Sequence, residues 1–217
     1  MLPLLLAILI IALITYLLIR NKKIKTPHEA GLVLNHKDLL NNEVGFYQRL
    51  SNDDKERFED MTSDFLQYVN IEGVGTEITD LDKVLIASSA VIPIFGFPEW
   101  KYNNLTNVIL YPDTFDKDFQ FEGENRSIMG MVGEGYMNGQ MLLSRAALTS
   151  GFSKSAGNQN TAIHEFVHLL DKSDGATDGI PENLLAHEYT LPWLKLMHRE
   201  MQRISSGKSD INPYALT

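Results

Sequence analysis

The stretch T-A-I-H-E-F-V-H-L-L-D, from Thr161 to Asp171, decides how this chain folds and what it can do. On a helix, side chains four positions apart lie one turn apart on one face, so His164 and His168 can bind a single ion. Glu165 lies beside His164, where its carboxylate can reach a metal-bound water. The apolar residues recur at helical spacing and predict a core-facing stripe on the opposite side. They are Ile163, Phe166, Val167 and Leu170.

The H-E-x-x-H spacing is typical of zinc hydrolases. Neutral imidazoles at His164 and His168 would bind Zn²⁺ through Nε2 at about 2.0–2.1 Å and leave room for a third ligand and water. Bound zinc lowers the pKa of water to about 7 and polarises a carbonyl. Glu165 would then be the general base. The alternative is two surface histidines on an ordinary helix, which the amphipathic context disfavours.

The sequence marks no third protein ligand. The longer pattern H-E-x-x-H-x-x-G-x-x-H fails, because positions 171 and 174 are both Asp. Asp171 either orients a ligand as a hydrogen-bond acceptor or is an exposed carboxylate near the helix end. Three downstream carboxylates lack a context that marks them as ligands: Glu182, Glu188 and Glu200.

Composition narrows the class of protein. With 217 residues, 44% of them hydrophobic, the chain is long enough for one domain with a substantial core. It contains no cysteine, which excludes disulfides, a cysteine nucleophile and thiolate zinc sites. The formal net charge of −9 argues against a nucleic-acid partner.

The N-terminal segment Met1–Ile19 carries no charged side chain, and as a helix it spans roughly 28 Å. A cluster of basic residues follows at once: Arg20, Lys22, Lys23 and Lys25. A secretory signal, which is the alternative, would have its positive charges before the apolar run. We therefore expect an uncleaved single-pass anchor, with the remaining chain in the cytoplasm.

The resulting domain organisation is an anchor at 1–19, a basic juxtamembrane linker at 20–34 and a folded domain at 35–217. Helices are predicted at 37–50, after Ser51, after Thr79 and at 191–204. Short strands are predicted at 107–111 and 140–144, and the segment 127–139, rich in Gly and Met, is predicted to be a loop. The fold class is α+β, mostly helical with a small sheet.

Several motifs in chain order resemble the Mlc titration factor A family of zinc peptidases. They are V-L-I-A-S-S-A-V-I-P-I-F-G-F (84–97), N-V-I-L-Y-P (107–112), G-E-G-Y-M-N-G-Q-M-L-L-S (133–144), H-E-F-V-H-L-L-D (164–171) with the D-G-A-T-D-G-I-P that follows, and I-N-P-Y-A-L-T (211–217). The resemblance runs from about Asn35 to Thr217. It implies a gluzincin-type peptidase with a zincin core, similar to the catalytic domain of anthrax lethal factor.

The resemblance also implies roles for individual residues. His164 and His168 match the zinc ligands, Glu165 matches the catalytic base, and Tyr214 matches a tyrosine that can hydrogen-bond the transition-state oxyanion. Family members carry the third ligand on a glutamate seven residues after that tyrosine, whereas this sequence stops at Thr217. We therefore expect a truncated domain that binds zinc weakly. The soluble enterobacterial members have no anchor, so their pairing with the Mlc repressor is not carried over, and a regulatory protein partner is not identified.

In zincin folds an edge strand beside the zinc pairs with extended substrate. The predicted strand just before the metal helix is a candidate for this role, with an internal sheet strand as the alternative. Its residues are Gln140, Met141, Leu142, Leu143 and Ser144.

The sequence thus predicts a membrane-anchored, zinc-dependent peptidase that acts on peptide or protein substrates. One alternative is a binding protein that keeps the fold without catalysis, and another is a zinc hydrolase of a different bond. Endopeptidase and aminopeptidase modes are equally compatible with the sequence.

Overall fold

The computed structural model describes residues 33–97, 99–154, 157, 159–175 and 187–209. Contacts divide the chain into Met1–Val33 and Leu34–Thr217, and all but the first of the described residues lie in the second unit. The predicted anchor, its basic cluster and Tyr214 lie outside the described residues. None of the helices within the described ranges combines the length and apolar character that a membrane span requires.

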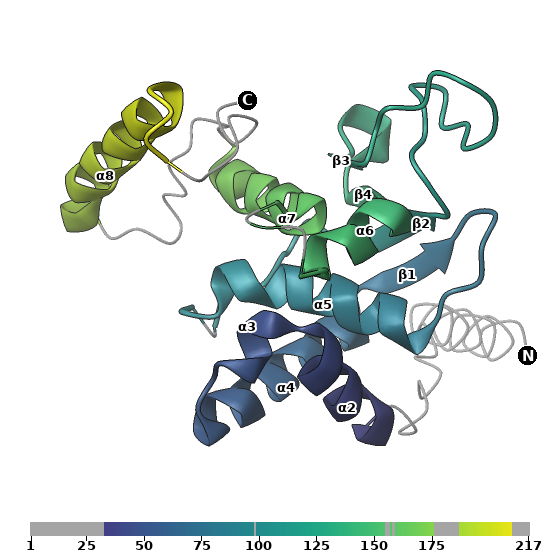
Figure 1. The fold of residues 1–217 in the computed structure, drawn as a ribbon, viewed down its shortest axis with the longest axis horizontal. Coiled ribbons are helices and arrows are strands. Elements are labelled where there is room, and N and C mark those ends of the chain that lie inside the picture. The colour runs from purple at the N-terminus through teal and green to yellow at the C-terminus, as the bar shows by residue number, and fades with distance from the viewer. Residues whose placement is uncertain (1–32, 98, 155–156, 158, 176–186, 210–217) are drawn as a thin grey trace, which may run out of the picture. The chain divides into compact units, whose positions relative to one another are not determined.

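Helices and a small sheet alternate along the described chain, which confirms the α+β class (Figure 1). In chain order the elements are α2 (Val33–Glu43), α3 (Gly45–Gln48), α4 (Asn52–Tyr68), β1 (Asn70–Gly73), α5 (Asp80–Ile94), β2 (Asn107–Tyr111), β3 (Gly130–Val132), the 3₁₀ helix η2 (Gly135–Met137), β4 (Gln140–Ser144), α6 (Arg145–Phe152), α7 (Thr161–Asp171), the 3₁₀ helix η3 (Lys172–Asp174) and α8 (His187–Ser205).

The sheet has the order β1-β2-β4-β3. The first three of these strands are parallel, and β3 pairs antiparallel to β4 with Met131 opposite Leu142. Strand β4 is therefore internal, and the expectation that it forms the edge beside the metal helix is wrong. The edge strand that contacts α7 is β3, and it lies in a segment predicted to be a loop. Three residues including a glycine are too short to show the period-two alternation that identifies a strand.

The two faces of the sheet have different cover. Side chains alternate between faces along a strand, so one face of β2 and β4 joins the main core formed with the helices. That face consists of Val108, Leu110, Met141 and Leu143. The other face packs against the segment between β2 and β3, through a smaller cluster made of Ile109, Tyr111, Phe115, Phe119, Phe121, Ile128, Met131, Met137 and Leu142.

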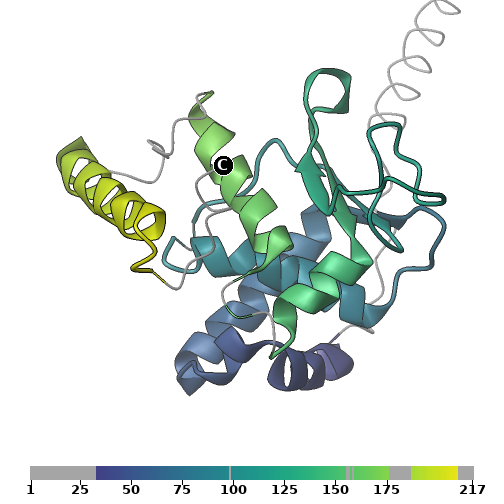
Figure 2. The same ribbon diagram turned by 45° about the horizontal axis from the view of Figure 1, so that its top comes forward.

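Helix α5 lies at the centre of the helical layer and packs against α4, α6 and α7 (Figures 1 and 2). Its run from Val84 to Val91 is buried at every position, as the apolar sequence predicts. A capping box begins the helix: the Asp82 amide donates to Thr79 Oγ1 at 3.2 Å, and the Thr79 amide donates to Asp82 Oδ2 at 2.8 Å. Helix α7 thus packs on a helix whose central run is fully buried.

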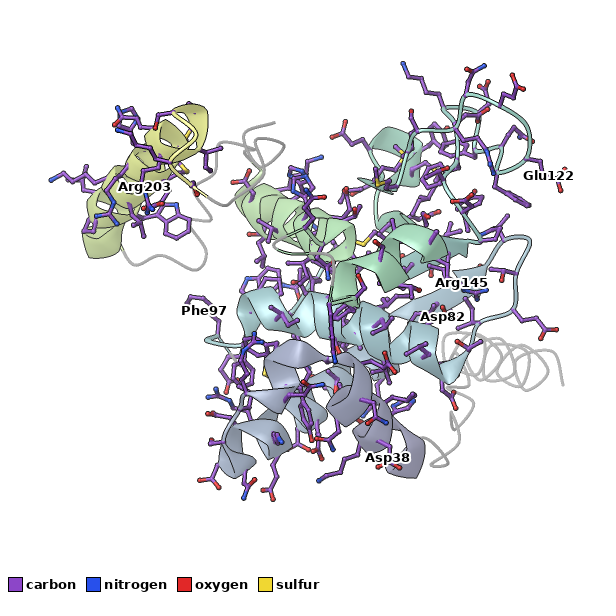
Figure 3. All side chains as sticks on the ribbon, in the orientation of Figure 1. Asp38, Asp82, Phe97, Glu122, Arg145 and Arg203 are labelled. Carbon is purple, nitrogen blue, oxygen red and sulfur yellow. The ribbon has the colours of Figure 1, made fainter. Side chains whose placement is uncertain are left out.

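Asp82 has a second role, because it also binds Arg145 at the junction of β4 and α6. Arg145 Nε donates to Asp82 Oδ1 at 2.9 Å and Nη2 donates to Oδ2 at 2.8 Å, and the same guanidinium bonds Thr76 and the carbonyl of Glu77. Figure 3 shows both side chains between α5 and the sheet. The Asp82 side chain is 4% exposed, so this bidentate pair is largely shielded from water.

Replacing Asp82 by Asn should lower the free energy of unfolding by about 2–4 kcal/mol, because the Arg145 guanidinium loses its charged partner in a largely buried place. Urea denaturation measures the change. The matched control is Asp53→Asn, an exposed acid in the first turn of α4, for which a change below about 0.5 kcal/mol is expected. Equal effects of the two substitutions would show that the pair contributes nothing specific.

Candidate metal centre

Helix α7 covers the predicted range Thr161–Asp171. Its N-cap is Asn160, whose Oδ1 accepts from the Ile163 amide at 3.0 Å and whose Nδ2 donates to the Gly151 carbonyl at 3.1 Å. After α7 and η3 the chain turns at Gly175, which has φ +94°, a conformation that glycine adopts without strain. The metal helix therefore begins and ends at residues suited to those positions.

The buried side of α7 is rotated from the predicted stripe. Ala162, Phe166 and Leu170 lie in the core, and the Phe166 ring contacts the rings of Tyr102 and Phe65 at centroid distances of 5.1 and 5.7 Å. Val167 is 46% exposed, so its predicted core position is wrong, and Glu165 is buried at 5% exposure. Helical spacing leaves the stripe's centre uncertain by one residue, and contacts with β3 and α5 fix it.

His164 and His168 direct their ring nitrogens at one another. Their Nε2 atoms are 2.9 Å apart, and the two rings lie edge to face with centroids 4.4 Å apart. Two Zn–N bonds of about 2.0–2.1 Å at a tetrahedral angle hold their nitrogens roughly 3.3 Å apart, so a shift of a few tenths of an ångström would admit the ion. Burial lowers the pKa of both histidines, which favours the neutral imidazole that binds metal.

The described residues supply no third ligand. No group of three His, Cys, Asp or Glu side chains suited to a metal occurs among them. Glu200 on α8 accepts from Arg203 at 2.9 Å and Arg199 at 3.3 Å. Glu182 and the side chain of Glu188 lie outside the described residues, as does Tyr214.

Asp171 is half-buried rather than exposed, and its Oδ1 has no hydrogen-bond partner within the described part of the chain. Its role beside the ligands stays a prediction.

Glu165 lies in the contact between α7 and the edge strand. Burial raises the pKa of Glu165 to about 7, and the positive charge of Lys172 acts in the opposite direction. A carboxyl with this pKa is well matched to accepting and returning a proton near neutral pH. The strand reaches it at Gly130, where a Cβ would lie 2.9 Å from Glu165 Cγ and 3.1 Å from Thr161 Cγ2. Only a glycine lets the backbone come this close.

The strand continues along α7 to its far end. Gly130 lies against Thr161 and Glu165, near the start of the helix, while Glu134 Oε1 accepts from Lys172 Nζ at 2.5 Å, just past its end. Glu134 is still extended, with φ −127° and ψ 162°. We call residues 130–134 the edge segment. Its residues carry no alternating apolar pattern, so the sequence does not identify it as a strand.

The edge segment has hydrogen-bonding groups on its open side. The Ser144 amide donates to the Met129 carbonyl, and the Gly133 amide donates to the Gln140 carbonyl. In an antiparallel ladder the residues that bond to the partner alternate with residues that do not. The backbone N–H and C=O groups of Gly130 and Val132 therefore point away from β4, toward the open edge of the sheet.

Comparisons with known proteins identify the family of the chain. The sequence profile of the family described as glucose-regulated metallo-peptidase M90 matches residues 18–217. The uncharacterized protein slr2042 of Synechocystis sp. is 26% identical over 192 residues, which cover 82% of this chain and 69% of that protein.

Gly130→Ala should lower the free energy of unfolding by about 1–3 kcal/mol, because the new methyl group meets Glu165 Cγ. In a Glu165→Ala background the same substitution should cost clearly less, since that atom is gone. Urea denaturation of the four proteins gives the coupling energy. Gly96→Ala is the control, because a Cβ there has open space. A zero coupling energy would mean that the strand does not constrain Glu165.

Proposed function

Because the chain belongs to the glucose-regulated metallo-peptidase M90 family, the Mlc titration factor A family that its motifs resemble, we propose that it is a zinc-dependent peptidase. The observation that carries the proposal is the joint placement of three side chains on α7. His164 and His168 point their Nε2 atoms at one place, and the buried carboxyl of Glu165 lies on the neighbouring side of the same helix. Peptides or small proteins are the proposed substrates.

The two histidines would hold the zinc, and a further ligand would complete a site of three protein ligands and water. When bound, the ion supplies a Lewis acid that lowers the pKa of a water to about 7 and polarises a carbonyl. Glu165 accepts the proton of the attacking water and donates it to the leaving amine. Its side chain is buried against Gly130, which shields the proposed base from bulk water.

An extended substrate would pair with β3 instead of the internal strand β4. The outward N–H and C=O groups of Gly130 and Val132 offer such a peptide a ladder of backbone hydrogen bonds, as in other cases of strand addition. The contact of Gly130 with Glu165 supports this proposal, because the ladder would begin at a residue that touches the proposed base. The substrate backbone would thus be held next to the group that acts on it.

Glu165→Gln keeps the size of the side chain and removes the proton acceptor. Zinc content should stay unchanged, because both histidines are intact, while the rate of peptide hydrolysis should fall by roughly 10²–10⁴-fold. Metal analysis after dialysis and a peptide-digestion assay measure the two quantities. Glu56→Gln, on the exposed side of α4, should leave both unchanged. Hydrolysis at the original rate by Glu165→Gln would remove this residue from the mechanism.

Val132→Pro removes one outward N–H and should raise KM about tenfold, the loss of roughly one hydrogen bond to the substrate, with zinc content retained. Met131→Pro is the matched control. Its amide faces β4, so this proline should instead lower the free energy of unfolding. If Val132→Pro left KM unchanged in a folded protein, substrate pairing with this edge would be excluded.

We further propose that Met1–Ile19 anchors the protein in a membrane, with the folded domain on the cytoplasmic side. The support is the uncharged apolar sequence and the basic residues that follow it. A reporter enzyme fused after Thr217 should be active only in the cytoplasm, and the protein should resist extraction from membranes by alkaline carbonate. Reporter activity outside the cytoplasm, or a mature N-terminus near residue 26, would contradict the anchor.

A further inference from the structure

The edge segment carries one charged side chain, Glu134, at the end of the backbone ladder proposed to bind substrate. Side chains at alternate positions share a face of a strand, so Glu134 faces α7 as Gly130 does. The bond from Lys172 shows this directly. The Glu134 side chain is 77% exposed, and Lys172 bonds one oxygen of a carboxylate that has two. A negatively charged acceptor therefore lies beside the end of α7.

Strand geometry relates this place to the scissile bond. Gly130 touches Glu165, so the bond to be cleaved lies near Gly130. Glu134 lies four residue steps along an extended chain from Gly130, which is about 13 Å. A substrate that pairs antiparallel to β3, the more stable arrangement, runs its N-terminal side toward Glu134. Glu134 thus faces the substrate three or four residues before the scissile bond.

We propose that Glu134 is a specificity-determining residue that binds a positive charge on the substrate, three or four residues N-terminal to the cleaved bond. The inference rests on the proposed peptidase function. The charge is an ammonium or guanidinium group, supplied by the free α-amino group of a short peptide or by a lysine or arginine side chain. Lys172 Nζ donates to the Glu134 carboxylate, so this side chain lies on the side of the edge segment that faces α7.

The Glu134–Lys172 pair does not prevent this binding. Exposed ion pairs contribute little free energy in water, so Lys172 can share the carboxylate with an incoming cation. Backbone pairing with β3 holds that cation at high local concentration, since the rest of the peptide is already bound. A hydrogen bond to a charged group then adds selectivity.

The test uses one peptide scaffold in four forms: with a free or acetylated N-terminus, and with Lys or Gln at the third and fourth positions before the cleaved bond. Affinity is measured by fluorescence anisotropy with the zinc-loaded Glu165→Gln chain, which does not consume the peptide. Rates as kcat/KM are measured with the chain that keeps Glu165. Glu134→Gln, Glu134→Lys and the control Glu124→Gln, an exposed acid on the segment that covers the other face of the sheet, are compared in both backgrounds.

We expect cationic forms to bind and react at least about fivefold better than neutral forms. Glu134→Gln should abolish that ratio, Glu134→Lys should invert it, and Glu124→Gln should preserve it. The acetylated peptides with and without lysine separate the two sources of charge.

Equal affinity for cationic and neutral peptides, or a ratio that survives Glu134→Gln, overturns the inference while the peptidase function stands. A zinc-loaded chain that neither binds nor cleaves any form overturns the proposed function and the inference with it.

Discussion

The bidentate contact between Asp82 and Arg145 is the interaction on which the arrangement of the site depends. Asp82 begins the buried helix α5 through the capping box, and Arg145 is the first residue of α6, directly after β4. The guanidinium also bonds Thr76 and Glu77, which lie just after β1. One shielded ion pair thus ties the start of the central helix to two strands of the sheet. Helix α7 packs on α5 and β3, so its position depends on theirs.

Glu165 is a carboxyl group in a buried position of the site. A buried carboxylate is costly, and core positions of a helix normally go to apolar side chains. Glu165 nevertheless takes such a position, because the absence of a side chain at Gly130 leaves space for it against the edge strand. Burial raises the pKa of Glu165 to about 7, which suits a group that must both accept and release a proton. The same close contact sets the distance between the proposed base and the proposed substrate ladder.

The edge segment contacts the proposed base at one end and carries the proposed specificity residue at the other. Its start lies on Glu165 and its end is bonded to Lys172, so it follows α7 past both histidines. Backbone groups on its open side are suited to hold any extended peptide, whereas the proposed role of the exposed Glu134 side chain is to distinguish among peptides by charge. Rate and specificity can therefore be altered at different positions of one short segment.

The sequence by itself determined the helix Thr161–Asp171 and the shared face of His164 and His168, because an H-E-x-x-H spacing and an amphipathic pattern are both local properties of a helix. It also determined the capped helix α5 with its mostly apolar run and the β-branched strand β2, whose signals lie within a few residues. The family followed from motifs in chain order and is shown by the match over residues 18–217.

Only the tertiary structure decided which strand is the edge, which face of α7 is buried and what lies against Glu165. Strand order depends on pairing between distant segments, so β4 could not be recognised as internal from its own five residues. The exposure of Val167 and the burial of Glu165 likewise follow from where β3 meets α7. Sequence spacing specifies which residues share a helix face, and only packing decides which face meets the core.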